Sequence, residues 1–132
     1  MADVPQFFRL NVEVGDLAAA QRFYETLFDM PGRGQAGNRF YLNTGPVVLQ
    51  VVDMAAFRAA PHPAAKALYF TVSDLDALHA LASSLDCLSD EMVHGLRGGD
   101  ISVKPWGERS FYVNDPWGNP LCFVEAGTVY AG

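Results

Sequence analysis

Cysteine, histidine and long apolar runs are all scarce in this sequence. Its 132 residues include two cysteines, Cys87 and Cys122, and three histidines. Two cysteines at this separation match neither a metal-binding motif nor a disulfide framework. No apolar run approaches the ~18 residues of a membrane-spanning helix, and no secretory signal peptide is visible at the start. We therefore expect a cytoplasmic protein with no membrane partner.

Positive charge is also scarce. Nine Lys and Arg face fifteen Asp and Glu, which gives a formal net charge of −6. A surface of that sign repels phosphate backbones, and no basic stripe with interleaved aromatic residues offsets it. The composition therefore argues against a nucleic-acid partner, and it favours a cationic ligand over an anionic one only weakly.

Hydrophobic residues are present in the proportion of an ordinary globular domain. They make up 50% of the chain, and charged residues make up 18%. This composition excludes disordered and fibrous classes, and the length is that of one domain that can bury its own core. We expect a single domain over residues 1–132.

The chain repeats an alternating segment that ends in an aspartate. Residues 10–17 read LNVEVGDL and residues 68–75 read LYFTVSDL. A period of two predicts strands, with Asn11 on one face of the first and Tyr69 and Thr71 on one face of the second. Asp16 and Asp74 then begin helices as N-caps, because a carboxylate accepts hydrogen bonds from the first free amides.

A second pair of similar segments supports an internal duplication. Residues 39–43 read RFYLN and residues 110–114 read SFYVN, each followed by a turn with Gly and Pro and another apolar run. The second copy carries extra polar residues between positions 86 and 100. We predict an α+β fold of two tandem β-α-β-β-β modules, about 5–55 and 65–127, joined by a linker over 56–64. Side by side, the modules would form a curved mixed sheet with helices outside and a central cleft.

This arrangement resembles the vicinal oxygen chelate superfamily, which includes glyoxalase I, extradiol dioxygenases, fosfomycin-resistance enzymes and bleomycin-resistance proteins. The resemblance covers nearly the whole chain. The closing motifs, KPWG at 104–107 and DPWGN at 115–119, are most similar to the bleomycin-resistance branch. The resemblance implies a homodimer with ligand clefts, since the family commonly completes its clefts across a two-fold axis.

The resemblance also implies where a metal ion would bind. Arg9, Ala67 and Cys122 occupy the strand positions at which metal-bearing members place His, His and Glu. Arginine and alanine cannot coordinate a metal, and one cysteine cannot hold a hard divalent ion. We therefore expect no metal and no cofactor, which argues against the metal-dependent isomerase, dioxygenase and epoxide-opening chemistries.

The remaining function is metal-independent binding of a small, partly aromatic molecule, such as an antibiotic or a metabolite. The alternative is an enzyme of the same superfamily with a non-standard site, of the lyase, isomerase or dioxygenase type. A dimeric scaffold without a ligand is a third possibility. No catalytic residue is assigned, although Glu13 or Glu125 could act as a general base.

Six residues are candidate ligand contacts, and each has a structural alternative. Arg9 could bind an anionic group, or it could pair with Glu13 or Glu125. Trp106 could cover a ligand, contact a second subunit or cap the core. The others would offer rings and hydrogen bonds or fill the sheet interior. The full set is Arg9, Asn11, Tyr69, Thr71, Trp106 and Tyr112.

The remaining nucleophilic and basic side chains have structural interpretations. Cys122 is expected to be buried on a central strand with no adjacent base, as an inert small hydrophobe. The histidines His62, His79 and His94 have no ligand spacing, and we expect them to be exposed or half-buried.

Overall fold

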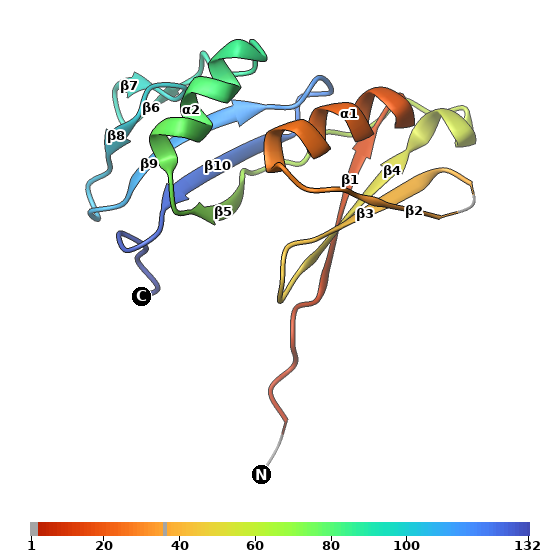
Figure 1. Cartoon of the computed structure of the whole chain (residues 1–132), viewed down its shortest axis with the longest axis horizontal. Coiled ribbons are helices and arrows are strands. Elements are labelled where there is room, and N and C mark those ends of the chain that lie inside the picture. Colours follow the sequence, from red (N-terminus) through yellow and green to blue (C-terminus); the bar gives the residue numbers. More distant parts are fainter. Residues whose placement is uncertain (1–2, 36) are drawn as a thin grey trace. The chain divides into compact units, whose positions relative to one another are not determined.

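The chain divides into two compact units, one ending at Pro63 and the other beginning at Ala64. A computed structural model describes residues 3–35 and 37–132 (Figure 1). We call the units the N-terminal and C-terminal modules and describe each by itself.

The N-terminal module is a mixed four-stranded sheet with a helix on one face. In chain order its elements are β1 (Arg9–Val14), α1 (Leu17–Phe28), β2 (Arg33–Gln35), β3 (Arg39–Asn43), β4 (Val48–Asp53) and a short 3-10 helix, η1 (Met54–Phe57). The strand order is β1-β4-β3-β2. The first strand runs parallel to β4 and the other pairs are antiparallel, because α1 crosses over between β1 and the meander.

The C-terminal module repeats this topology. Its elements are β5 (Leu68–Val72), α2 (Leu75–Ser84), β6 (Met92–Val93), β7 (Leu96–Arg97), β8 (Ser102–Val103), β9 (Arg109–Asn114) and β10 (Pro120–Glu125). The strand order β5-β10-β9-β8 has the same sense as that of the first module. The α+β class and the two tandem modules are confirmed, whereas the central cleft stays a prediction.

The extra polar residues of the second module border its sheet. They contain the hairpin β6–β7, and the backbone on either side of it bonds to Tyr112. The Ser89 N–H donates to the Tyr112 carbonyl at 3.0 Å, and the Tyr112 N–H donates to the Gly98 carbonyl at 2.8 Å. The insertion therefore satisfies backbone groups of β9 that the shorter β8 leaves unpaired.

Both helices begin where the sequence predicts. An oxygen of Asp16 accepts a hydrogen bond from the Ala19 N–H at 2.9 Å, and one of Asp74 accepts from the Ala77 N–H at 3.0 Å. Neither of these helices is long and apolar enough to cross a membrane, and the same holds for all helical segments in the described ranges.

Each sheet packs one face against its helix and leaves the other without a helix (Figure 1). The helix-covered faces carry the core, for example Val12 and Val14 in the first module and Phe111 and Phe123 in the second. Asn11, Tyr69 and Thr71 alternate with core residues and are exposed. The predicted alternation is confirmed, and we call the second surface of each sheet its free face.

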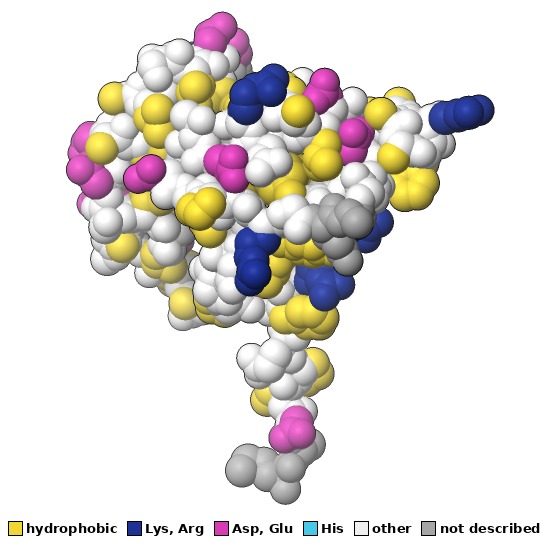
Figure 2. Space-filling model, turned by 45° about the vertical axis from the view of Figure 1, so that its right-hand side comes forward, with side chains coloured by type: hydrophobic (Ala, Val, Ile, Leu, Met, Phe, Trp, Pro, Cys, Tyr) yellow, Lys and Arg dark blue, Asp and Glu magenta, His cyan; other side chains and the backbone are white. Residues whose placement is uncertain are grey.

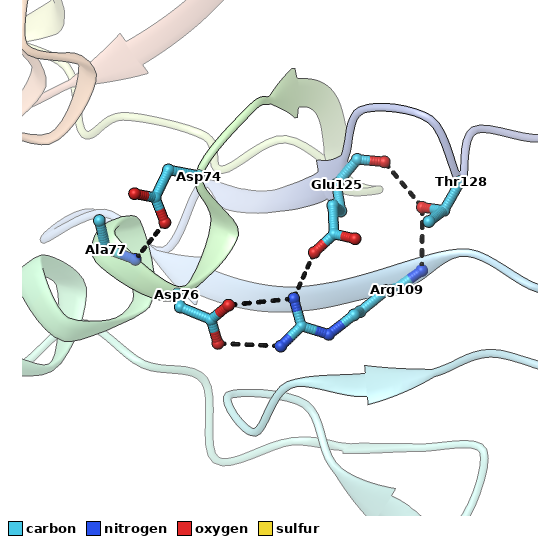
Figure 3. Close-up of polar contacts among 6 residues, drawn as sticks. All are labelled: Asp74, Asp76, Ala77, Arg109, Glu125 and Thr128. Atoms are coloured by element: carbon cyan, nitrogen blue, oxygen red, sulfur yellow. Dashed lines mark hydrogen bonds and ion pairs between the residues drawn. The ribbon is translucent and has the colours of Figure 1, made fainter.

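An ion-pair network joins the start of α2 to the sheet (Figure 3). The Arg109 guanidinium binds both carboxylate oxygens of Asp76 and also binds Glu125. The hydrogen bonds from Arg109 lower the pKa of Asp76, and the two carboxylates raise the pKa of Arg109. Thr128 extends the network, since its hydroxyl donates to the Glu125 carbonyl at 2.7 Å. The Glu125 carboxylate is thus bound to Arg109 on the helix-covered face of the sheet.

The DPWGN segment forms the tight turn between β9 and β10. One Asp115 oxygen accepts from the backbone N–H groups of Trp117 and Asn119, at 2.9 and 2.8 Å, and the other accepts from the Asn119 side chain. Gly118 adopts a φ of 85°, which a residue with a Cβ rarely does. The predicted hairpin turn is confirmed.

Candidate functional site

Arg9 lies at the start of β1 on the free face of the N-terminal module. Its guanidinium lies over the Phe8 ring, 5.0 Å from the centroid. Within the described ranges no ion pair involves Arg9: Glu13 accepts the His62 N–H at 2.8 Å, and Glu125 binds Arg109. That Arg9 binds an anionic group of a ligand stays a prediction.

Cationic and hydrophobic side chains adjoin one another near the N-terminal arm. Figure 2 shows them side by side at the base of the extended segment that precedes β1. Phe7 and Phe8 lie in this segment and are exposed. Two positions after Arg9 on β1, the Asn11 side-chain oxygen accepts a hydrogen bond from the Gln50 amide at 3.0 Å. The free face of this module is thus polar and cationic around Asn11.

The free face of the C-terminal module is aromatic instead. Cys122 on the central strand β10 pairs with Tyr69 on one side and Tyr112 on the other, so all three side chains share this face. The Tyr69 and Tyr112 hydroxyls lie 3.1 Å apart and form a hydrogen bond. The register thereby places Tyr112, whose orientation the sequence left open, beside Tyr69.

A pocket of about 410 Å³ opens on this free face. This volume falls within the range of about 300–1,000 Å³ that ligand sites occupy. Three of the predicted contacts, Tyr69, Thr71 and Trp106, line it together. Its full lining is Tyr69, Phe70, Thr71, Trp106, Glu108, Val124, Val129 and Tyr130.

A second hollow of about 340 Å³ lies on the other side of Tyr69. Tyr69 and Tyr112 both line it, together with Lys66 and Glu91. The four predicted contacts of this module therefore surround two adjoining hollows. That Arg9 and Asn11 face the same ligand stays a prediction.

Glu108 fixes two walls of the first pocket. One carboxylate oxygen accepts the Trp106 indole N–H at 2.7 Å, and the other accepts the Tyr130 backbone N–H at 2.8 Å. Both hydrogen bonds lower the pKa of Glu108, and the bond from Trp106 has the larger effect. The side chain is therefore an ionised carboxylate at neutral pH, and it holds both the tryptophan and the C-terminal tail.

Lys104 is buried at the base of the same free face, with an exposed fraction of 5%. Its ammonium donates to the Ser102 hydroxyl at 2.7 Å and to the Ser110 carbonyl at 3.3 Å. It also lies 5.6 Å from the centroid of the Tyr112 ring. Burial lowers the pKa of Lys104, because a charged amine loses its hydration there.

Cys122 is buried next to this lysine, as the sequence predicts for a central strand. Burial raises the pKa of its thiol to about 11, although hydrogen bonds with Ser110 and Tyr112 and the charge of Lys104 act in the opposite direction. Burial and the Tyr69 hydroxyl likewise raise the pKa of Tyr112. The Cys122 thiol and the Tyr112 hydroxyl are thus held in their protonated forms.

The residues present do not fit a divalent metal ion. Arg9 and Ala67 offer no ligand atom, and Cys122 is a protonated thiol beside the cationic Lys104. Throughout the described part of the chain, no group of three or more His, Cys, Asp and Glu side chains is arranged to hold one.

The histidines lie apart, exposed or half-buried as expected. His62 bonds to Glu13, and His79 contacts the Gly99 carbonyl at 2.8 Å. His94 packs edge-on against Trp106, with the ring centroids 5.1 Å apart.

Sequence reasoning missed Lys104, Glu108 and Tyr130. A usable signal existed for Glu108, because positions 108, 110 and 112 alternate onto the face that carries Tyr112. No comparable signal exists for Tyr130, which follows the last strand and is positioned by its backbone bond to Glu108.

Residues 6–123 match the family model of the Glyoxalase/Bleomycin resistance protein/Dioxygenase superfamily. The chain belongs to this superfamily. No curated protein matches the sequence significantly.

Solved structures of the superfamily share the fold. A glyoxalase/bleomycin resistance protein from Albidiferax ferrireducens T118 superposes with a TM-score of 0.73 at 19% identity, over 90% of this chain and 97% of that one. Lactoylglutathione lyase from Agrobacterium tumefaciens superposes with a TM-score of 0.66 at 19% sequence identity, and the match covers 95% of this chain and 96% of that one. Oxidase ChaP-H2 superposes with a TM-score of 0.74 at 23% sequence identity, and the match covers 98% of this chain and 100% of that one. Identities this low establish the fold alone. These structures include a lyase and an oxidase, so superfamily membership does not specify a reaction.

Proposed function

We propose that this superfamily member binds a small, partly aromatic molecule on the free face of its C-terminal module without a metal ion. The observation that carries the proposal is the pocket of about 410 Å³ that brings Tyr69, Thr71 and Trp106 together. Sequestration of an antibiotic or a metabolite fits such a site, because binding alone then suffices.

The chemistry of the pocket supports this function. Aromatic side chains provide large contact areas at small cost in conformational entropy. Trp106 is already fixed by its hydrogen bond to Glu108, so a ligand that stacks on it does not have to order it. The Thr71 and Tyr69 hydroxyls supply the few polar contacts that orient a bound molecule.

Tryptophan fluorescence tests the proposal. We expect a screen of aromatic antibiotics and metabolites to give a ligand that changes the emission of Trp106 in buffer containing EDTA, and mass spectrometry to recover it unchanged. A Trp106→Leu variant should lose the response, whereas Trp117→Phe, which removes the other tryptophan, should keep it. Equal responses from Trp106→Leu and wild type would place the ligand elsewhere.

An enzyme is the second candidate, and the buried Lys104 is the observation that favours it. A lysine with a lowered pKa is a recognised acid–base group or nucleophile, and this one lies next to the Tyr112 ring. A lyase or isomerase of this kind would lose turnover in Lys104→Met while still binding its substrate. The Glu13→Gln variant tests the other general base in the same assay.

We further propose that the protein acts in the cytoplasm as a homodimer. Light scattering on the purified chain should give a mass of two subunits, about 29 kDa, from a chain mass of 14.4 kDa. A mass of one subunit across the working concentration range would contradict the dimer.

A further inference from the structure

The pocket around Trp106 combines several aromatic rings with a single ionised group. We propose that its ligand presents an organic cation, preferably a quaternary amine, held against the rings of Tyr69, Trp106 and Tyr130 with Glu108 as the counter-charge. This inference rests on the proposed function and adds the chemical class of the ligand.

The three rings are exposed and yet line one pocket. Their exposed fractions are 58% for Tyr69, 39% for Trp106 and 62% for Tyr130. They come from β5, from the loop after β8 and from the C-terminal tail. Rings of Trp and Tyr attract a cation through the negative potential of their faces, and several rings around one space form the usual binding site for alkylated ammonium groups.

Glu108 gives this pocket a net negative charge. It is the only acidic or basic side chain, tyrosines aside, among the residues that line the pocket. Its two hydrogen-bond donors, the Trp106 indole and the Tyr130 backbone, are both neutral. Lys104 donates instead to Ser102 and Ser110 and does not line the pocket. The charge of Glu108 is therefore left for a ligand to balance.

The hydrogen bond from Trp106 to Glu108 also strengthens the ring as a cation site. Donation of the indole N–H to a carboxylate shifts electron density into the indole, since hydrogen bonds to charged groups polarise their partners. The lining includes four aromatic rings, and both oxygens of its one carboxylate already accept hydrogen bonds. The pocket should therefore prefer a methylated ammonium to a primary amine, which needs several acceptors in place of water.

A charge series on one ring skeleton tests the inference. Benzyltrimethylammonium, benzyl alcohol and phenylacetate share a phenyl ring and carry a positive, no and a negative charge. We expect Trp106 fluorescence to report at least tenfold tighter binding of the cation than of the alcohol, with the carboxylate weakest. The N-methyl proton resonances of the bound cation should shift upfield, because the ligand methyl groups lie over aromatic rings.

Variants then separate the charge from the rings. Glu108→Gln should weaken binding of the cation about tenfold, which corresponds to about 1.4 kcal/mol. The affinity for benzyl alcohol should change by less than about twofold. Glu91→Gln is the matched control, because Glu91 lines the neighbouring hollow and not this pocket; it should change neither ligand. Tyr69→Leu, which leaves Glu108 in place, should weaken the cation more than the alcohol.

The outcomes distinguish this inference from the proposed function. Binding of benzyl alcohol or phenylacetate as tightly as the cation, with loss in Trp106→Leu, would overturn the cation site and leave small-molecule binding intact. Failure of every aromatic compound to perturb Trp106 would overturn both. If Glu108→Gln does not fold, the wild-type charge series and Tyr69→Leu still decide, because neither changes Glu108.

Discussion

Lys104 is placed where its residue type is rarely found. It is buried, and its amine is bound by a hydroxyl, a carbonyl and the face of a tyrosine ring. None of these partners carries a full negative charge, so the ammonium loses hydration without an ion pair in return. Lys104 also lies beside the buried thiol of Cys122.

Replacing Lys104 should therefore separate stability from function. We expect Lys104→Met, which keeps an unbranched side chain, to unfold at the same temperature as wild type or a higher one. Lys104→Ala leaves a cavity and should be about 2 kcal/mol less stable than Lys104→Met. Thermal unfolding measures both. A large loss of stability in Lys104→Met would show that the amine holds the strands together.

The pKa of Glu108 predicts how the pocket responds to acid. The folded-state pKa lies below that of the unfolded chain, so this group stabilises the fold above the unfolded value of about 4.3. That contribution is lost as the pH falls through the folded pKa. We expect Trp106 emission to change in wild type once the pH has fallen below that unfolded-state pKa, and we expect Glu108→Gln to lack this step. An identical acid transition in both proteins would contradict this role.

Cys122 should be unreactive in the folded protein. A thiol with a pKa of about 11 holds little thiolate at pH 8, and burial blocks access to it. We expect iodoacetamide to leave Cys122 unmodified for hours in the native state and to modify it within minutes in guanidinium chloride. Cys87 should follow the same pattern, because burial raises the pKa of its thiol to about 11 as well. Rapid labelling of Cys122 in the native protein, located by mass spectrometry, would contradict this expectation. It would show that the side chains that cover Cys122 move apart.

Among the elements, the turn between β9 and β10 depends on one carboxylate. Asp115 is buried and accepts hydrogen bonds from Trp117 and from both the backbone and the side chain of Asn119. We expect Asp115→Ala to cost about 2–4 kcal/mol, because it leaves these donors unsatisfied. The N-cap variant Asp16→Ala is the comparison, with a loss of about 1 kcal/mol. Urea unfolding measures the free energy of unfolding of both variants. Similar losses would contradict the expectation that Asp115 contributes more to stability than the N-cap Asp16.

The elements that could be predicted from sequence are those with local causes. The strands before Asp16 and Asp74 alternate with period two, both aspartates cap helices, and DPWG forms a turn. Each depends on residues that are close in the chain. The orientation of Tyr112 was not predictable, because it follows from the register between β9 and β10.

The missing members of the site have non-local causes. Burial of Lys104 depends on the rings and strands that pack around it, and Tyr130 is placed through its bond to Glu108 across the C-terminal tail. Neither effect leaves a periodic pattern in the sequence. Trp106 was singled out because two turn-forming residues flank it, whereas its hydrogen bond to Glu108 was visible only in the structure.

For the molecule as a whole, duplication has given two modules of one topology with different free faces. The N-terminal module presents Arg9, Asn11 and Gln50, while the C-terminal module presents a pocket lined by Tyr69 and Trp106. Among the described residues of the two modules, no group of three His, Cys, Asp or Glu side chains could hold a divalent ion. The superfamily fold carries here a set of polar groups that includes the buried Lys104.

Metal content tests the central claim most directly. Elemental analysis of untagged protein, purified without chelator from cells supplied with zinc, nickel, manganese and iron, should find far less than one ion per chain. The residues at the superfamily's metal positions predict this result. About one ion per chain would contradict the metal-independent account and would require a ligand set that includes residues such as Glu13, Gln50 or His79.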